Sequence, residues 1–129
     1  MGMDNENLWP AKFEVPDIEL PVTILKRQAA NLSTLTKGLL EGKLEGTKGI
    51  EDNFGYTFYI IAPALGNYRY RFFEVRYGIS LYPINIRTSG ETWVKLETPG
   101  KFKEHLRKIF GSPETLKIVG ALLKQSTSN

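Results

Sequence analysis

The chain lacks cysteine, has a single histidine and contains no long apolar run among its 129 residues. The absence of cysteine excludes disulfide scaffolds, thiolate zinc sites and cysteine nucleophiles. The shortness of the apolar runs excludes a membrane-spanning helix, so we expect no membrane partner. The first ten residues, MGMDNENLWP, contain no apolar segment of the kind that directs export, and we therefore expect a cytoplasmic location.

The composition is that of a folded protein, with 41% hydrophobic and 24% charged residues. A chain of this length suits one domain with one ordinary core. We predict a single globular domain over residues 1–129, in which residues 1–16 form an extended arm and residues 125–129 form a frayed tail.

The charge is divided unevenly along the chain. Residues 1–64 carry 6 Lys/Arg against 9 Asp/Glu, whereas residues 65–129 carry 11 against 5. This asymmetry indicates either an anionic partner or an attraction between oppositely charged faces of two copies.

The first half of the chain predicts a helix followed by two strands. Apolar residues recur at helical spacing over residues 21–37, and Gly38 is typical of a helix end. Residues 39–47 alternate weakly and are broken by glycines, which favours an edge strand. Residues 54–62 are apolar on both faces and predict a central strand, and Gly66-Asn67 suits a tight turn with a residue at positive φ.

The strand predicted after this turn inverts its alternation of apolar and polar residues at Phe72 and Phe73. Two interpretations stay open. A β-bulge at these two residues would keep one face of the strand on the core, and the alternative is a strand covered on both faces. Further strands are predicted over residues 79–87 and 92–96.

Two helices are predicted to close the chain, starting at residues 98–99 and 112–114. The order of a helix, an antiparallel sheet of four or five strands and two helices indicates an α+β fold with the helices packed on one sheet face. The predicted core residues come from different elements and are Phe58, Ile60, Phe72, Val75, Leu106 and Leu122.

The sequence indicates no catalytic residue, no metal ligand and no cofactor site. His105 lies in a predicted helix beside lysines, whereas a general base needs an orienting partner and a metal site needs several ligands. No G-x-S-x-G motif supplies a serine nucleophile. We therefore favour a function without catalysis and without a cofactor.

Two short stretches nevertheless resemble part of a known catalytic motif. Pro16-Asp17 followed by Glu41-Gly42-Lys43 resembles the P-D…E-x-K pattern of restriction-type nucleases. The resemblance implies a metal-dependent nuclease in which Asp17 and Glu41 hold a divalent metal ion and Lys43 steadies the attacking water or the phosphate. A nuclease is the second alternative function.

Nucleic-acid binding by the basic C-terminal half is the first alternative function. Arg69 and Arg71 interleave with Tyr68 and Tyr70, and aromatic rings with arginines are typical of surfaces that bind single strands. On a strand, however, this alternation places the tyrosines and the arginines on opposite faces. The closing helices add positive charge at Lys101, Lys103, Arg107, Lys108, Lys117 and Lys124.

The main hypothesis is a protein-protein interaction module that binds another protein, or a second copy as a homodimer, through the uncovered sheet face and its rim. Arginine and tyrosine are enriched at interface hot spots. In the homodimer, Tyr82 and Ile84 are expected to form the apolar centre of this face. The predicted interaction surface consists of Arg69, Arg71, Glu74, Arg76, Tyr82 and Arg87.

Overall fold

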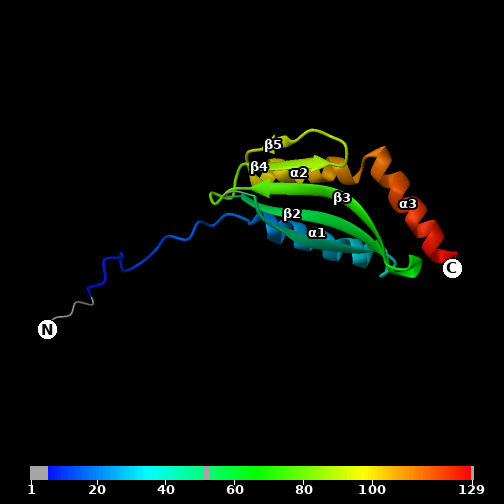
Figure 1. Cartoon of the computed structure of the whole chain (residues 1–129), viewed down its shortest axis with the longest axis horizontal. Helices are drawn as coiled ribbons and strands as arrows, with labels where there is room; N and C mark the ends of the chain where they lie inside the picture. The colour runs from blue at the N-terminus through cyan, green and yellow to red at the C-terminus, as the bar shows by residue number, and fades with distance from the viewer. Residues whose placement is uncertain (1–5, 51–52, 129) are drawn as a thin grey trace.

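The computed structural model describes residues 6–50 and 53–128. These residues form three α-helices, one 3-10 turn and five strands (Figure 1). In chain order the elements are α1 (Pro21–Leu35), β1 (Glu41–Ile50), β2 (Asn53–Ala62), the turn η1 (Pro63–Leu65), β3 (Tyr68–Tyr77), β4 (Ile84–Thr88), β5 (Val94–Leu96), α2 (Pro99–Phe110) and α3 (Pro113–Thr127).

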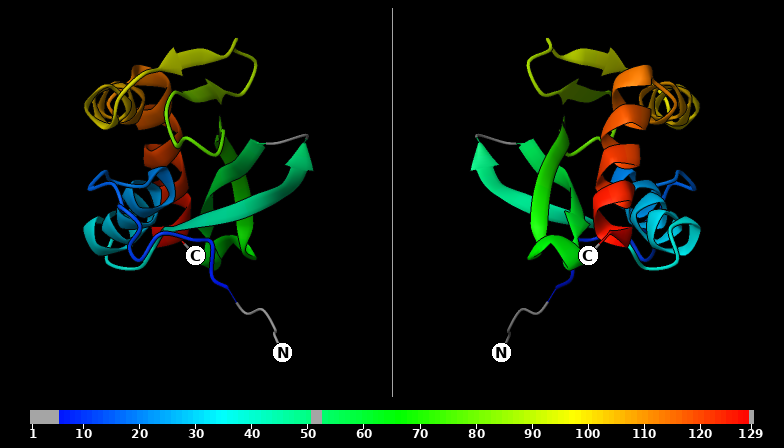
Figure 2. Two further views of the ribbon diagram at one scale, coloured as in Figure 1. Left: turned by 90° about the vertical axis from the view of Figure 1, so that its left-hand side faces the viewer. Right: turned by 90° about the vertical axis from the view of Figure 1, so that its right-hand side faces the viewer.

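The five strands form one antiparallel sheet in the order β1-β2-β3-β4-β5, so that each strand pairs with its neighbours in the sequence. Figure 2 shows the three helices on one side of this sheet. The α+β fold predicted from the sequence, with helices on one sheet face, is confirmed.

Helix α1 starts where the sequence predicts and ends slightly early. Pro21 occupies its first turn, where the fixed φ of proline suits a helix, and Ile24 and Leu25 are buried against the sheet. After the helix, Lys37 and Gly38 adopt φ values of 52° and 82°. This left-handed pair ends the helix and turns the chain into β1.

The apolar and polar alternation of β3 inverts at a β-bulge. Of the two interpretations left open by the sequence, the bulge is therefore confirmed, and the strand covered on both faces is not. Phe73 pairs with Phe58 across the sheet, whereas Arg71 pairs with Tyr59, which leaves Phe72 as the extra residue. Phe72 and Phe73 are both buried on the helical side, where the centres of their rings lie 5.1 Å apart. The extra residue restores the alternation, so β3 keeps the same face on the core along its whole length.

The region between β3 and β4 differs from the prediction. β4 begins at Ile84 rather than at residue 79, because the chain first makes a turn in which the Leu81 N–H donates to the Gly78 carbonyl at 3.0 Å. Leu81 has a φ of 78°, which interrupts an extended strand. The turn between β2 and β3 is as predicted, because Gly66 and Asn67 both have positive φ.

The two closing helices start at capped ends and complete the core. The Thr98 and Ser112 side chains accept hydrogen bonds from the backbone N–H groups of Lys101 and Thr115. All six predicted core residues are buried.

The ends of the domain differ slightly from the predicted boundaries. Helix α3 continues to Thr127, beyond the residue 125 at which a tail was expected, and the extended arm continues to residue 20 rather than 16. The expected arm and tail also include residues 1–5 and 129, which lie outside the described part of the chain.

Candidate interaction surface

The sheet face that carries no helix, which we call the open face, is organised by the pairing of β2 with β3. Neighbouring residues of a strand point to opposite faces. Phe58 points toward the helices, so Tyr59 points away from them, together with its cross-strand partner Arg71. Arg69, two residues before Arg71 on the same strand, also points away from the helices. Because of the bulge at Phe72, the open face continues through residues 74 and 76 instead of changing sides.

Register along the other strands extends this face. Asn85 pairs with both Arg76 and Lys95, and Arg87 pairs with Glu74. The charged side chains of the open face are Glu41, Lys43, Glu45, Arg69, Arg71, Glu74, Arg76, Arg87 and Lys95. Among the paired strand residues that the structure describes, this face carries six cationic and three anionic side chains, so their net charge is positive.

The first arginine cluster surrounds Tyr59. The guanidinium carbon of Arg69 lies 4.2 Å from the centre of the Tyr59 ring, and the same guanidinium forms an ion pair with Glu45 of β1. The ring and the carboxylate together hold Arg69 in one place across the β1-β2-β3 part of the sheet.

The second cluster is an ion-pair network around Glu74. The Oε1 atom of Glu74 lies 2.8 Å from Arg71 Nη2 and 3.0 Å from Arg87 Nε. Glu74 is only 13% exposed, whereas the two arginines keep 55% and 38% of their side-chain surface in water. One largely buried carboxylate therefore orients two guanidinium groups toward the solvent.

Trp93 completes the open face and was not among the residues predicted from the sequence. The guanidinium carbons of Arg76 and Arg87 lie 4.9 Å and 4.6 Å from the centre of its ring. The available signal was the turn at residues 88–91, since a hairpin at this point brings Trp93 beside Arg87 on the neighbouring strand. Arg76 has no carboxylate within ion-pair distance in residues 6–50 and 53–128.

Tyr82 and Ile84 do not lie where the sequence predicted. Ile84 is fully buried on the helical side, so it cannot form an apolar centre of the open face. Tyr82 belongs to the loop before β4, where its hydroxyl donates to the Glu19 carbonyl at 3.0 Å. Burial, followed by the charge of Glu19, raises the pKa of Tyr82 to about 12. The structure thus brings together five of the six predicted surface residues and places Tyr82 elsewhere.

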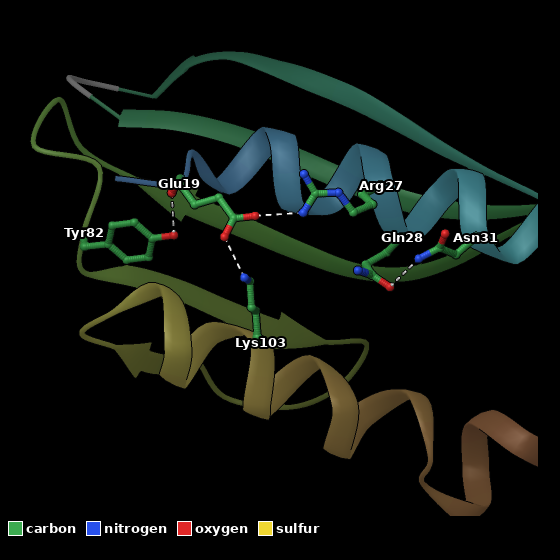
Figure 3. A network of polar contacts seen from close by, with 6 residues as sticks. All are labelled: Glu19, Arg27, Gln28, Asn31, Tyr82 and Lys103. Carbon is green, nitrogen blue, oxygen red and sulfur yellow. Dashed lines mark hydrogen bonds and ion pairs between the residues drawn. The ribbon is translucent and has the colours of Figure 1, made fainter. Parts of the chain in front are cut away.

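Glu19 is the centre of a separate polar cluster at the base of the N-terminal arm. Figure 3 shows its carboxylate between Lys103 of α2, at 2.6 Å, and Arg27 of α1, at 2.8 Å. The hydrogen bond from Lys103, and then that from Arg27, lower the pKa of this carboxyl group. These contacts and the bond from Tyr82 fix the arm to the domain at one point.

The residues of the nuclease pattern lie in different surroundings. Asp17 is an exposed residue of the arm, whereas Glu41 and Lys43 are exposed residues of β1. Among the described residues, no hydrogen bond or ion pair joins Asp17 to either of them, and no group of three His, Asp or Glu side chains is placed to hold a metal ion. His105 is half-buried on α2, where burial and then the charge of Lys108 lower its pKa.

Comparisons with known proteins add no family to this picture. No protein-family model matches the chain, and neither a curated protein nor a solved structure gives a significant match. In the described part of the chain, no helix has the length and apolar character that crossing a membrane requires.

Proposed function

We propose that this chain is a non-catalytic protein-interaction module, and that its open face binds an acidic surface of another protein. The observation that carries the proposal is the gathering of Arg69, Arg71, Arg76 and Arg87 around Tyr59 and Trp93 on a face without helices. Arginine, tyrosine and tryptophan are the residues most enriched at interface hot spots.

The contacts within this face also favour binding because they restrict the arginines before a partner arrives. Arg69 lies over the Tyr59 ring, and Arg76 and Arg87 lie against the Trp93 ring. Arg87 also forms an ion pair with the Glu74 carboxylate. Ordering a free arginine side chain on binding costs about 0.5–1.5 kcal/mol, and side chains that are already ordered lose less.

Charge selects the kind of partner. The open face is net positive, so two copies that met through it would bring like charges together, which opposes the homodimer predicted from the sequence. A partner rich in carboxylates would instead form bidentate pairs with the exposed guanidinium groups. An acidic segment or surface of a different protein is therefore the occupant that we propose.

Nucleic acid is the second candidate, and one observation favours it. Tyr59 and Trp93 share the open face with the arginines, unlike Tyr68 and Tyr70, the two tyrosines that interleave with Arg69 and Arg71 in the sequence. Bases could stack on such rings. A guanidinium group already lies on each of the two rings, however, so stacking requires these arginines to move. This competition ranks nucleic acid below an acidic protein.

The proposal is tested by selection from peptide libraries, with Trp93 as the reporter. In a Trp9→Phe variant Trp93 is the only tryptophan, and its fluorescence reports on the open face. We expect selection to enrich acidic peptides over basic ones, and Arg76→Ala to weaken the binding of a selected peptide about tenfold. Lys117→Ala, on α3 at the helical side, is the matched control and should bind as the parent does.

A single-stranded oligonucleotide titrated in the same assay separates the two candidates. Binding of the oligonucleotide with steep salt dependence, together with no enrichment of acidic peptides, would replace the protein proposal with the nucleic-acid one. Equal enrichment of acidic and basic peptides would contradict the charge argument.

A further inference from the structure

The N-terminal arm exposes large apolar side chains to water. In residues 6–20, Leu8 is 85% exposed and Trp9 is 73% exposed, and Phe13 and Val15 are exposed as well. The Trp9 and Phe13 rings touch each other, 5.7 Å apart, and Figure 1 shows the arm extending away from the domain. Apolar groups gathered in this way on a soluble chain indicate a binding partner.

The helical layer contains a groove that fits such side chains. A cavity of about 220 Å³ opens between α1 and α3. Phe58, Ile60 and Phe72 of the sheet form its floor, and Leu32, Leu35 and Leu116 form its apolar walls. A cavity of about 150 Å³ is enough to take a benzene ring, so this one has room for an aromatic side chain.

The groove continues between α1 and α2 as a second cavity of about 230 Å³, which shares Gln28 and Phe110 with the first. Figure 3 shows Gln28 projecting from α1 on the side that faces α2. Lys103 and Arg107 line this second cavity. Arg107 has no ion-pair partner in the described part of the chain. The groove is therefore apolar at one end and basic at the other.

The charges of the arm and of the helices are complementary. Residues 6–20 carry four acidic residues and one lysine, whereas the three helices together carry eight Lys/Arg and two Glu. Along the arm, the aromatic residues come first and the acidic residues Glu14 and Asp17 follow. Along the groove, the apolar end likewise adjoins the basic end.

We propose that the arm of one copy binds in the groove of a second copy, with the Trp9 ring in the apolar cavity and the acidic residues beside Arg107. Exchange in both directions gives a symmetric dimer with two equal contacts. The arm leaves its own domain at Glu19, which is fixed by Lys103, and extends away from the helices that form its own groove (Figure 1). This dimer uses the helical side and leaves the open face accessible.

The first test follows Trp9 in the full-length chain with Trp93→Phe, in which Trp9 is the only tryptophan. Sedimentation at about 1–100 µM should show a dimer that dissociates on dilution. Over the same dilution series, the emission maximum of Trp9 should shift to the red, because dissociation returns its ring to water. Raising NaCl from about 0.05 M to about 0.5 M should weaken the dimer, because screening reduces the attraction between arm and helices.

Variants of the arm and of the groove separate this dimer from other contacts. Trp9→Ser in the parent chain and Leu116→Glu at the groove wall, where the leucine is 60% exposed, should each weaken dimerisation about tenfold or more. Ile79→Glu is the matched control, since this exposed apolar residue belongs to the loop before β4 and does not line the groove; it should dimerise as the parent does.

A mixing experiment tests whether the contact forms between two chains. A chain without residues 1–16 keeps an intact groove, and the Leu116→Glu chain keeps an intact arm. Each alone should be monomeric, and a mixture of the two should form a heterodimer. A monomer at all concentrations, or Trp9 emission that is blue-shifted independently of dilution because the arm folds onto its own groove, would overturn the proposal. A dimer unaffected by Leu116→Glu would overturn it equally.

Discussion

The close approach of α1 to β1 makes Gly42 a position at which one added methyl group should be damaging. A Cβ atom at this residue would lie 2.6 Å from the Cα of Ala29, 2.7 Å from the Cβ of the same alanine and 2.9 Å from Cζ of Phe58. The nearest obstacle is backbone, which cannot rotate away as a side chain can. Gly42→Ala therefore requires the helix to move from the sheet.

The magnitude follows from two opposing effects. Overpacking of a core costs about 1–3 kcal/mol. Replacing glycine by alanine lowers the entropy of the unfolded chain, which offsets about 0.4–1 kcal/mol of that cost. We expect a net loss of about 1–2 kcal/mol in the free energy of unfolding. Gly46→Ala, on the same face of β1, is the matched control, because its added Cβ would meet no atom closer than 3.7 Å.

Urea unfolding followed by circular dichroism measures both variants against the parent chain. A change in the midpoint with an unchanged slope would identify a loss of stability rather than a change in the unfolded state. If Gly42→Ala is as stable as Gly46→Ala, the contact between α1 and β1 is looser than the structure has it, and the reasoning fails.

Three further predictions concern the core and the base of the arm. Phe58→Ala should lower the free energy of unfolding by about 3–5 kcal/mol, because this ring is buried, whereas Phe54→Ala, at a half-exposed ring of the same strand, should cost clearly less in the same urea assay. Lys103 lowers the pKa of Glu19 below its ordinary value of 4.5, so Glu19 of the native protein stays ionised at pH values where the unfolded chain takes up a proton. The free energy of unfolding should therefore fall as the pH drops below 4.5, and Glu19→Gln should flatten this loss in thermal melts. The pKa of Tyr82 is raised from 10.0 to about 12, so stability should be lost as the pH rises through this interval, and Tyr82→Phe should lose less of it.

The elements that could be predicted from the sequence are those whose signals are local. Pro21 and Gly38 bound α1, and Thr98 and Ser112 cap the closing helices, since each acts on the backbone within a few residues of itself. The late start of β4 depends instead on the positive φ of Leu81, a conformation that leucine rarely adopts and that no local pattern indicates.

The late start of β4 also explains why Tyr82 does not lie on the open face, where the sequence predicts it. A strand that begins at residue 79 would place Tyr82 and Ile84 on one face by alternation, and the sequence predicts this face to be the open one. In the structure Ile84 pairs with Tyr77 on the helical side, and Tyr82 lies in a loop that reaches Glu19, 63 residues earlier in the chain. Such a contact depends on the assembled fold, and local periodicity carries no information about it.

The candidate surface depends on a single extra residue. Arg69 and Arg71 stand at odd positions of β3, whereas Glu74 and Arg76 stand at even ones, so an unbroken strand would put the two pairs on opposite faces. The bulge at Phe72 brings them to the same face and buries one more phenylalanine on the other. The pair of adjacent aromatic residues thus stabilises the core and, through the register that it sets, also assembles the arginines that we propose as the binding surface. A strand that reads as irregular in the sequence is for this reason the element from which the surface could be inferred.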